Sequence, residues 1–170
     1  IHRTFISKNA ELMVKAFKAY VRPILEYSST VWNPHLLKDI NSVENVQRRF
    51  TKRLAPKDLS YDQRLAYLNL DRLELRRIRF DAILCFNIIR NILLSCDNFF
   101  TISSGITRSC LNTNLYPSKF RLDSGKFSFS NRCINIWNSL PTELRSCKTA
   151  DAFKKGLSKI DFGSFIRGRT

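Results

Sequence analysis

The basic side chains near residue 50 offer the clearest chemistry in this sequence. Arg49 and Arg53 are four residues apart, as are Arg48 and Lys52, so a helix makes each pair like-charged neighbours. Each pair destabilises an isolated helix by roughly 0.2–0.5 kcal/mol, so packing or an anionic partner has to offset that cost. Guanidinium groups bind phosphate oxygens in a forked geometry. The cluster therefore predicts a phosphate-binding helix face.

A second set of basic residues follows on later predicted helices. Arg72, Arg76 and Arg79 share a flank of the next long helical stretch, so the two helices are expected to present parallel rows of arginine. Lys154 and Lys155 face outward on the last predicted helix. We predict that this set and the first cluster bind nucleic acid through phosphate contacts with little sequence preference.

The distribution of charge agrees with a polyanionic partner. Lys and Arg number 29 against 14 Asp and Glu, which gives a formal net charge of +15. Residues 47–90 carry 11 basic and 5 acidic residues, residues 117–170 carry 11 and 4, and residues 91–116 carry one of each. A uniformly solvated basic surface is the alternative, but charge gathered in two blocks favours nucleic-acid binding.

Aromatic side chains could add base stacking to these phosphate contacts. The candidates are Tyr20, Tyr27, Trp32, Phe50 and Trp137. Because large aromatic rings are usually buried to a high degree, we expect most of the five to be core residues. Stacking on a base is the less favoured alternative for each of them.

The sequence gives no support for enzymatic chemistry. A polymerase site needs two neighbouring carboxylates to hold its metal ions, and the chain has no Asp-Asp pair. His2 and His35 are far apart and have no nucleophile constellation around them, and the five cysteines include no CxxC pair. We expect no catalytic residue, metal site or cofactor in these 170 residues. The most apolar window, residues 82–94, is too short to span a bilayer, so we expect no membrane association.

Helical apolar spacing must position the basic residues. Pro and Asn-Pro breakers separate the helical stretches, and Ser7 or Asn9, Ser60 and Thr149 are candidate N-caps. The expected fold class is mainly α, a helical bundle with a loop-rich middle and a small β-hairpin. The predicted helices span residues 7–22, 24–32, 36–54, 60–68, 71–94, 131–140 and 149–160.

The middle of the chain differs in composition from the rest. Ser, Thr and Asn dominate residues 95–125, which predicts loops with short strands, and alternating apolar residues over 119–128 predict a hairpin with its turn at 123–125. We therefore divide the chain into a helical region with basic faces, a loop and hairpin linker, and a small basic C-terminal helical region. These regions span residues 1–95, 96–127 and 128–170.

Four motifs resemble a known family. They are YVRPILEYSSTVWNPH, VENVQRRFTKRL, LELRRIRFD and FSNRCINIWNSLP, which lie between residues 20 and 141, and the likeness around them covers residues 12–157. The chain resembles, in this order of motifs, the region that follows the polymerase core in reverse transcriptases of non-LTR retrotransposons of the LINE type, the jockey- and CR1-like elements.

The resemblance implies a role for the helices. In such enzymes this region contains the helical thumb, which grips the template–primer duplex, so the helices at 40–54 and 72–94 would be thumb-like and the partners would be RNA and DNA. The upstream palm of the parent polymerase would be a further partner, and Mg²⁺ is expected only in that absent palm. The likeness also implies an intracellular location, in nucleus and cytoplasm.

Two alternatives stay open at this point. The basic rows could dock an acidic protein or the rest of a parent enzyme, which would make the chain a protein-interaction or structural module. The chain could also be an inert remnant of a decayed transposon, since it lacks the palm and the Cys/His knuckle of some relatives. Preference among RNA, DNA and their hybrid does not follow from the sequence.

Overall fold

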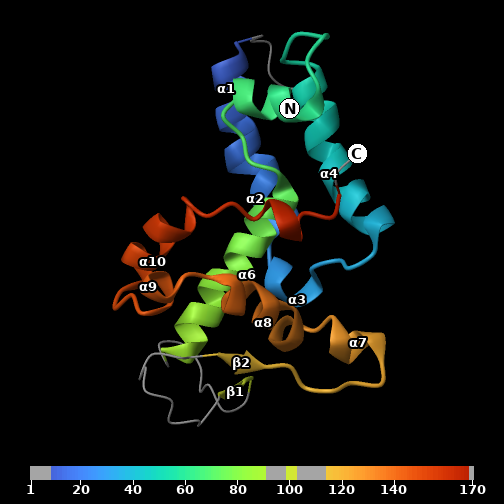
Figure 1. The fold of residues 1–170 in the computed structure, drawn as a ribbon. Coiled ribbons are helices and arrows are strands. Elements are labelled where there is room, and N and C mark those ends of the chain that lie inside the picture. The colour runs from blue at the N-terminus through green and yellow to red at the C-terminus, as the bar shows by residue number, and fades with distance from the viewer. Residues whose placement is uncertain (1–8, 91–98, 103–113, 169–170) are drawn as a thin grey trace. The chain divides into compact units, whose positions relative to one another are not determined.

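The structure, a computed structural model, describes residues 9–90, 99–102 and 114–168. Helices dominate these residues (Figure 1), so the predicted mainly α fold class is confirmed. The chain divides into two compact units. Unit 1 comprises the residues up to Arg77 together with the segment from Arg167 onward, and unit 2 comprises Ile78–Ile166. Each unit is described by itself.

Unit 1 begins with a helical segment that is broken into more pieces than the two helices predicted over residues 7–22 and 24–32. The Asn9 side chain caps the first helix by accepting hydrogen bonds from the backbone N–H groups of Glu11 and Leu12, as the sequence predicted for one of two candidate caps. This first helix is α1 (Ala10–Ala16). The π-helical turn η1 (Phe17–Val21), α2 (Arg22–Glu26) and α3 (Ser29–Trp32) follow it, with a local change of pitch at η1.

Three further helices complete unit 1: α4 (Leu37–Lys52), α5 (Tyr61–Tyr67) and the first residues of α6 (Leu73–Ile89). The predicted capping box starts α5, since the Ser60 hydroxyl accepts from the Gln63 N–H and the Gln63 side chain accepts from the Ser60 N–H. The predicted end of the α6 helix, Leu94, lies outside the described residues.

A Schellman motif ends α5. The Leu70 N–H donates to the Leu65 carbonyl at 2.9 Å, the Asn69 N–H donates to the Ala66 carbonyl at 3.2 Å, and Asn69 takes the left-handed conformation with φ 50°. Asparagine adopts this conformation more readily than most residues. The motif fixes where the chain turns after α5.

The core of unit 1 forms where α1, η1, α4 and α5 meet. Phe17 and Phe50 stack with ring centroids 4.3 Å apart, and Met13, Leu65 and Leu68 are buried beside them. Most of the apolar residues of α1 and of the second half of α4 therefore face the interior, while Leu12, an apolar residue of the predicted first helix, is 43% exposed.

Unit 2 contains the rest of α6 and the elements that follow it. Its core includes Phe86 stacked on Phe153 at 4.4 Å between ring centroids, with the fully buried Trp137 at 6.1 Å from Phe153. Thr149 caps the last α-helix, as predicted. The elements are β1 (Thr101–Ile102), β2 (Leu115–Tyr116), α7 (Asp123–Lys126), α8 (Phe129–Ser139), α9 (Thr142–Arg145), α10 (Ala150–Leu157) and the 3₁₀ turn η3 (Gly163–Phe165).

The hairpin predicted over residues 119–128 is wrong. The Leu122 carbonyl accepts hydrogen bonds from the N–H groups of Gly125 and Lys126, both at 3.1 Å, so the predicted turn is the helix α7. A Cβ on Gly125 would lie 2.5 Å from the Phe120 ring, so glycine is needed for this close approach. Among the described residues the paired strands are β1 and β2, which are antiparallel in the loop-rich middle, where the sequence predicted short strands.

The compact units do not follow the predicted boundaries. The boundary between units falls inside α6, after Arg77, and Arg167 and Gly168 belong with unit 1. Contacts between residues far apart in sequence cause this return to unit 1, and no composition change marks it. The division at 1–95, 96–127 and 128–170 stays a prediction of domain organisation.

Candidate nucleic-acid interface

The C-terminal half of α4 carries the exposed part of the first basic cluster. Arg49 and Lys52 are exposed on the helix, and Arg53 is exposed at its C-cap. Arg48 is half-buried. The sequence thus predicted the outward-facing side of this helix correctly, and the cations near its C-terminus also interact favourably with the helix dipole.

Arginines from three elements surround the Tyr61 ring at the start of α5. The guanidinium carbon of Arg48 lies 4.8 Å from the ring centroid, that of Arg72 5.5 Å and that of Arg64 5.7 Å. These are cation–π distances, so the ring helps to hold like charges near one another. Arg64 also donates from Nη1 to the Leu59 carbonyl at 2.8 Å.

Arg64 is a basic residue that the sequence reasoning missed. It lies three residues after Tyr61 on the same helix, so helical spacing alone could have placed it beside that ring. We name the resulting patch the α4–α5 basic surface. It comprises Arg48, Arg49, Lys52, Arg53 and Arg64.

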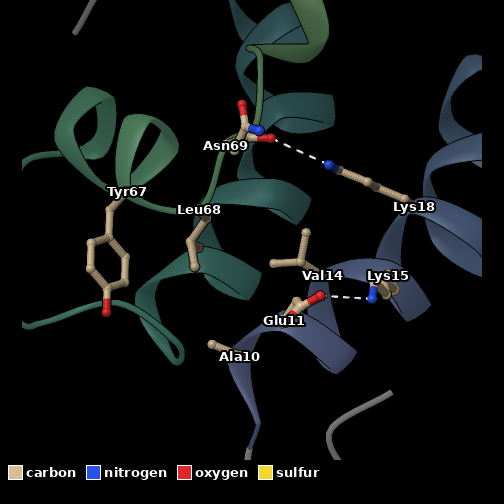
Figure 2. A pocket seen from close by; sticks show the side chains of 8 residues that line it. All are labelled: Ala10, Glu11, Val14, Lys15, Lys18, Tyr67, Leu68 and Asn69. Carbon is tan, nitrogen blue, oxygen red and sulfur yellow. Dashed lines mark hydrogen bonds and ion pairs between the residues drawn. The ribbon is translucent and has the colours of Figure 1, made fainter.

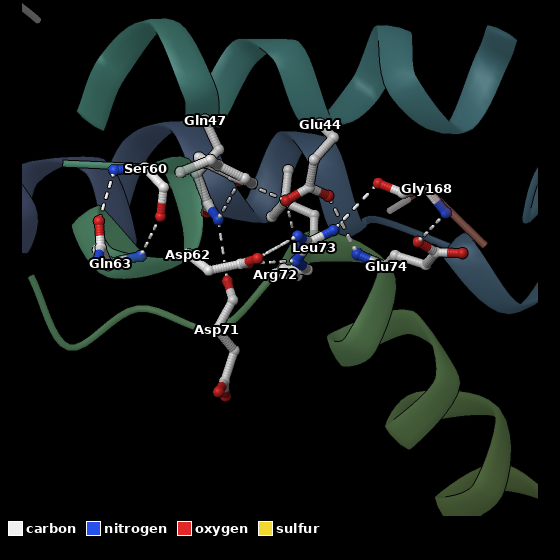
Figure 3. Close-up of polar contacts among 11 residues, drawn as sticks. Glu44, Gln47, Ser60, Asp62, Gln63, Asp71, Arg72, Leu73, Glu74 and Gly168 are labelled. Carbon is white, nitrogen blue, oxygen red and sulfur yellow. Dashed lines mark hydrogen bonds and ion pairs between the residues drawn. The ribbon is translucent and has the colours of Figure 1, made fainter. Parts of the chain in front are cut away.

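A buried carboxylate holds α4 against the start of α6. Glu44 is 2% exposed and lies on the inner face of α4, next to the predicted apolar stripe. It accepts hydrogen bonds from the N–H groups of Leu73 at 3.2 Å and Glu74 at 3.3 Å (Figure 3). It also accepts a hydrogen bond from the Tyr61 hydroxyl. A carboxylate there satisfies free N–H groups of the helix terminus and is stabilised by the helix dipole.

Gln47 and Tyr61 extend this buried network. The Gln47 amide nitrogen donates to the Asp71 carbonyl at 2.9 Å and to the Tyr61 hydroxyl oxygen at 3.2 Å. Burial raises the pKa of Tyr61 well above its usual value, and the nearby Glu44 carboxylate raises it further. The network therefore fixes Tyr61, and with it the ring beside which the arginines lie.

The predicted arginine row on α6 is occupied by ion pairs. Arg72 donates from Nε and Nη2 to the two carboxylate oxygens of Asp62, each at 2.8 Å, and from Nη1 to the Gly168 carbonyl at 3.0 Å. Arg76 forms a two-pronged pair with Glu26, whose hydrogen bonding raises the pKa of Arg76. Both guanidinium groups thus have carboxylate partners within unit 1, so their binding to nucleic acid stays a prediction.

The remaining predicted residues lie in unit 2. Arg79 is half-buried on α6, and Lys154 and Lys155 are exposed on α10. Lys154 Nζ lies 3.5 Å from a carboxylate oxygen of Asp151, in an exposed pair that contributes little. The predicted residues of α4 and Arg64 therefore belong to unit 1, whereas Arg79, Lys154 and Lys155 belong to unit 2.

The expectation that most of the five candidate aromatics are core residues is wrong, because only two of them are buried. Phe50 is 6% exposed and Trp137 is fully buried, whereas Tyr20 is 66%, Tyr27 79% and Trp32 40% exposed. Trp32 is positioned by its Nε1–H, which donates to the Tyr27 carbonyl at 2.6 Å. The single helix predicted for this region is broken at the left-handed Ser28, which is why its apolar spacing did not predict burial. Ile24 and Val31 are exposed beside these aromatics in the sequence.

Within residues 9–90, 99–102 and 114–168, no group of three or more His, Cys, Asp or Glu side chains could hold a metal ion. The helices of this described part also include none that is long and apolar enough to cross a membrane.

Comparison with known proteins gives one short similarity. No protein-family model matches the chain, and no solved structure matches it. The uncharacterized protein B0403.1 of Caenorhabditis elegans is 34% identical over 80 residues, which cover 45% of this chain and 40% of that protein. The chain therefore spans less than half the length of the relative it matches.

Proposed function

We propose that this chain binds nucleic acid through the α4–α5 basic surface, as a C-terminal, thumb-like part of a LINE-type reverse transcriptase. The observation that carries the proposal is the exposure of Arg49, Lys52 and Arg53 at the C-terminal end of α4, next to Arg48, whose guanidinium group shares the Tyr61 ring with that of Arg64. Each of these cations can bind a phosphate oxygen, and the arginines can do so with two parallel N–H donors.

The position of the cations explains why a phosphate backbone suits this surface. On α4, Arg49 and Arg53 are successive members of one helical row, about 6 Å apart along the axis. Like charges so close repel one another, and phosphates that lie between them relieve that repulsion. The ion-paired Arg72 and Arg76 then support the surface by holding α5 and α2 in place, rather than by meeting the ligand.

The sequence resemblance supports the same proposal. The VENVQRRFTKRL motif covers the second half of α4 and its C-cap, and it includes four of the five surface cations. The proposed ligand is a template–primer duplex of RNA and DNA, and the reaction itself belongs to a palm outside these 170 residues, where Mg²⁺ would act. On this proposal the protein works inside the cell, in nucleus and cytoplasm.

Salt-dependent binding to an RNA–DNA hybrid tests the proposal. Fluorescence anisotropy across a salt series would compare the wild type with the triple variant Arg49→Ala, Lys52→Ala, Arg53→Ala. Each phosphate contact contributes about 0.9 to the slope of log K against log[salt] for a duplex, so the variant should lose about 2 to 3 from that slope. Affinity at low salt should fall at least about tenfold.

The control removes the same charge from another part of the chain. Lys119, Lys148 and Lys159 are exposed in unit 2, and their replacement by alanine lowers the net charge equally. That control should bind nearly as the wild type does. Weak binding of the wild type, or equal losses in both triple variants, would contradict the proposal and favour the protein-interaction module.

A further inference from the structure

A pocket of about 410 Å³ lies between α1 and the end of α5 in unit 1. This volume is within the range of about 300–1,000 Å³ that small-molecule sites occupy. Figure 2 shows the side chains of Val14 and Leu68 directed toward one another and Lys18 reaching across to Asn69. The lining residues are Ala10, Glu11, Val14, Lys15, Lys18, Tyr67, Leu68 and Asn69.

The pocket combines an apolar floor with a charged rim. Val14 and Leu68 are each 7% exposed and belong to the core of unit 1, so the floor is rigid. Tyr67 is 63% exposed and offers an aromatic face at the rim. Two lysines line the rim, which disfavours a cationic ligand, and the floor favours a flat apolar group.

Lys18 is held where an anion can reach it. Its ammonium group donates to the Asn69 carbonyl at 3.3 Å, and the Schellman motif after α5 fixes that carbonyl. An ammonium group has three donors, so this bond leaves two for a ligand. The other lysine, Lys15, is paired with Glu11 at 2.7 Å and is less available.

The pocket continues the α4–α5 basic surface along α5. Arg64 belongs to that surface and Tyr67 to the pocket, and residues three apart on a helix are neighbours on its surface. The rise between them is about 4.5 Å. The basic surface and the pocket therefore share the helix α5.

We propose that this pocket binds one unpaired nucleotide, with its base between Tyr67 and the floor of Val14 and Leu68 and its phosphate on Lys18. The inference rests on the proposed function and adds a defined subsite to it. Stacking on Tyr67 suits any base. The Glu11 carboxylate at the rim is an acceptor for an exocyclic amino group, which favours adenine, cytosine or guanine over uracil.

Adenosine 5′-monophosphate is the probe that tests the subsite. In a titration followed by two-dimensional ¹H–¹⁵N NMR, it should shift the amide signals of residues 10–18 and 67–69. Adenosine and ribose 5-phosphate, each of which lacks one half of the ligand, should bind more weakly. Equal binding of ribose 5-phosphate would overturn the assignment of a base to the pocket.

Matched variants assign the two halves of the ligand to residues. Lys18→Ala and Tyr67→Ala should each weaken binding of the mononucleotide by about fivefold or more, while Tyr67→Phe keeps the ring and should bind nearly as the wild type does. Lys38→Ala removes an equal charge from an exposed position on α4 and should have no effect. Circular dichroism confirms that each variant is folded.

The same samples separate the two proposals. If the RNA–DNA hybrid binds but the mononucleotide leaves the pocket signals unchanged, the subsite is overturned and the α4–α5 basic surface stands. If neither ligand binds, both proposals fail. If both bind and only the mononucleotide responds to Lys18→Ala and Tyr67→Ala, the subsite is supported as a site separate from the duplex contacts.

Discussion

At the scale of single residues, Glu44 joins α4 to the first residues of both α5 and α6. Its two carboxylate oxygens accept three hydrogen bonds, from one side chain and two backbone N–H groups. From the sequence, a glutamate beside an apolar helix face is expected to be exposed to water. The spacing of residues does not show which hydrogen-bond donors will lie near its carboxylate in the fold. The burial of Glu44 was therefore beyond sequence reasoning.

Replacing Glu44 by glutamine tests the importance of its charge. The amide places an NH₂ group where the second carboxylate oxygen now accepts, opposite a backbone N–H, so one donor loses its acceptor. We expect Glu44→Gln to lower the free energy of unfolding by about 1–3 kcal/mol in urea denaturation. Asp39→Asn, at an exposed site in the first turn of α4, is the matched control. A loss below about 0.5 kcal/mol at position 44 would contradict this role.

Tyr61 predicts a pH dependence of stability. Its pKa is raised in the folded protein, so its contribution is fully present below the unfolded pKa of about 10 and is lost as the pH rises above that value. Tyr61→Phe removes the hydroxyl and its bond to Glu44. We expect this variant to be less stable by about 1–2 kcal/mol at pH 7 and to lose less further stability between pH 9 and 11.

Urea denaturation at several pH values measures both effects. Tyr20, which is exposed, provides a control through Tyr20→Phe, which should follow the wild-type pH dependence. Identical slopes for the wild type and Tyr61→Phe above pH 10 would show that ionisation of Tyr61 does not limit alkaline stability.

At the scale of elements, helical spacing predicted most of the helices and their caps. The capping box at Ser60, the cap at Thr149 and the helix over 37–52 follow from local rules, and the structure has them. The predictions that failed concern segments whose local structure depends on tertiary contacts. The segment that includes the exposed Tyr27 breaks at a left-handed residue, and the predicted turn at 123–125 closes as a helix.

The same limit applies to the candidate interface. Sequence spacing placed Arg49, Lys52 and Arg53 on an outer helix face, but it could not show that Arg72 and Arg76 have acidic partners 10 and 50 residues away in the chain. A row of arginines has the same sequence pattern whether it binds phosphates of a ligand or carboxylates of the same protein. Only the folded structure shows which of the two it binds.

The contact between α9 and α10 gives a prediction at this scale. A Cβ on Gly156, within α10, would lie 2.3 Å from Cδ1 of Leu144 on α9. Glycine to alanine in a helix normally stabilises by about 1 kcal/mol, but here the methyl group meets a buried neighbour. We expect Gly156→Ala to be neutral or destabilising in the wild type. In a protein that already carries Leu144→Ala, the same change should raise the free energy of unfolding relative to the Leu144→Ala variant.

Thermal or urea unfolding of the two single variants and the double variant forms a double-mutant cycle for this contact. The coupling energy should be about 1 kcal/mol or more, because the two side chains compete for one space. Additive effects within about 0.3 kcal/mol would show that Leu144 moves aside without cost.

At the scale of the whole molecule, the net charge of +15 was the strongest clue in the composition, and it does not by itself locate a ligand. The fold uses part of that charge internally, as in the pair of Arg132 with the buried Asp81 in unit 2, with Nε–Oδ2 at 2.9 Å. Fewer cations are therefore available to a ligand on the surface than the net charge suggests. For this reason the proposed experiments change only a few side chains.

The return of Arg167 and Gly168 to unit 1 has a consequence for how the protein is made. Their backbone N–H groups donate to Glu74 at 2.9 and 3.0 Å, so a glutamate near the start of α6 is completed by residues more than ninety positions later. Domains generally fold as they leave the ribosome, N-terminal first. Here residues 78–166 are synthesised before the last part of unit 1. The Glu74 carboxylate therefore keeps its water molecules until Arg167 and Gly168 have left the ribosome and can donate their N–H groups to it.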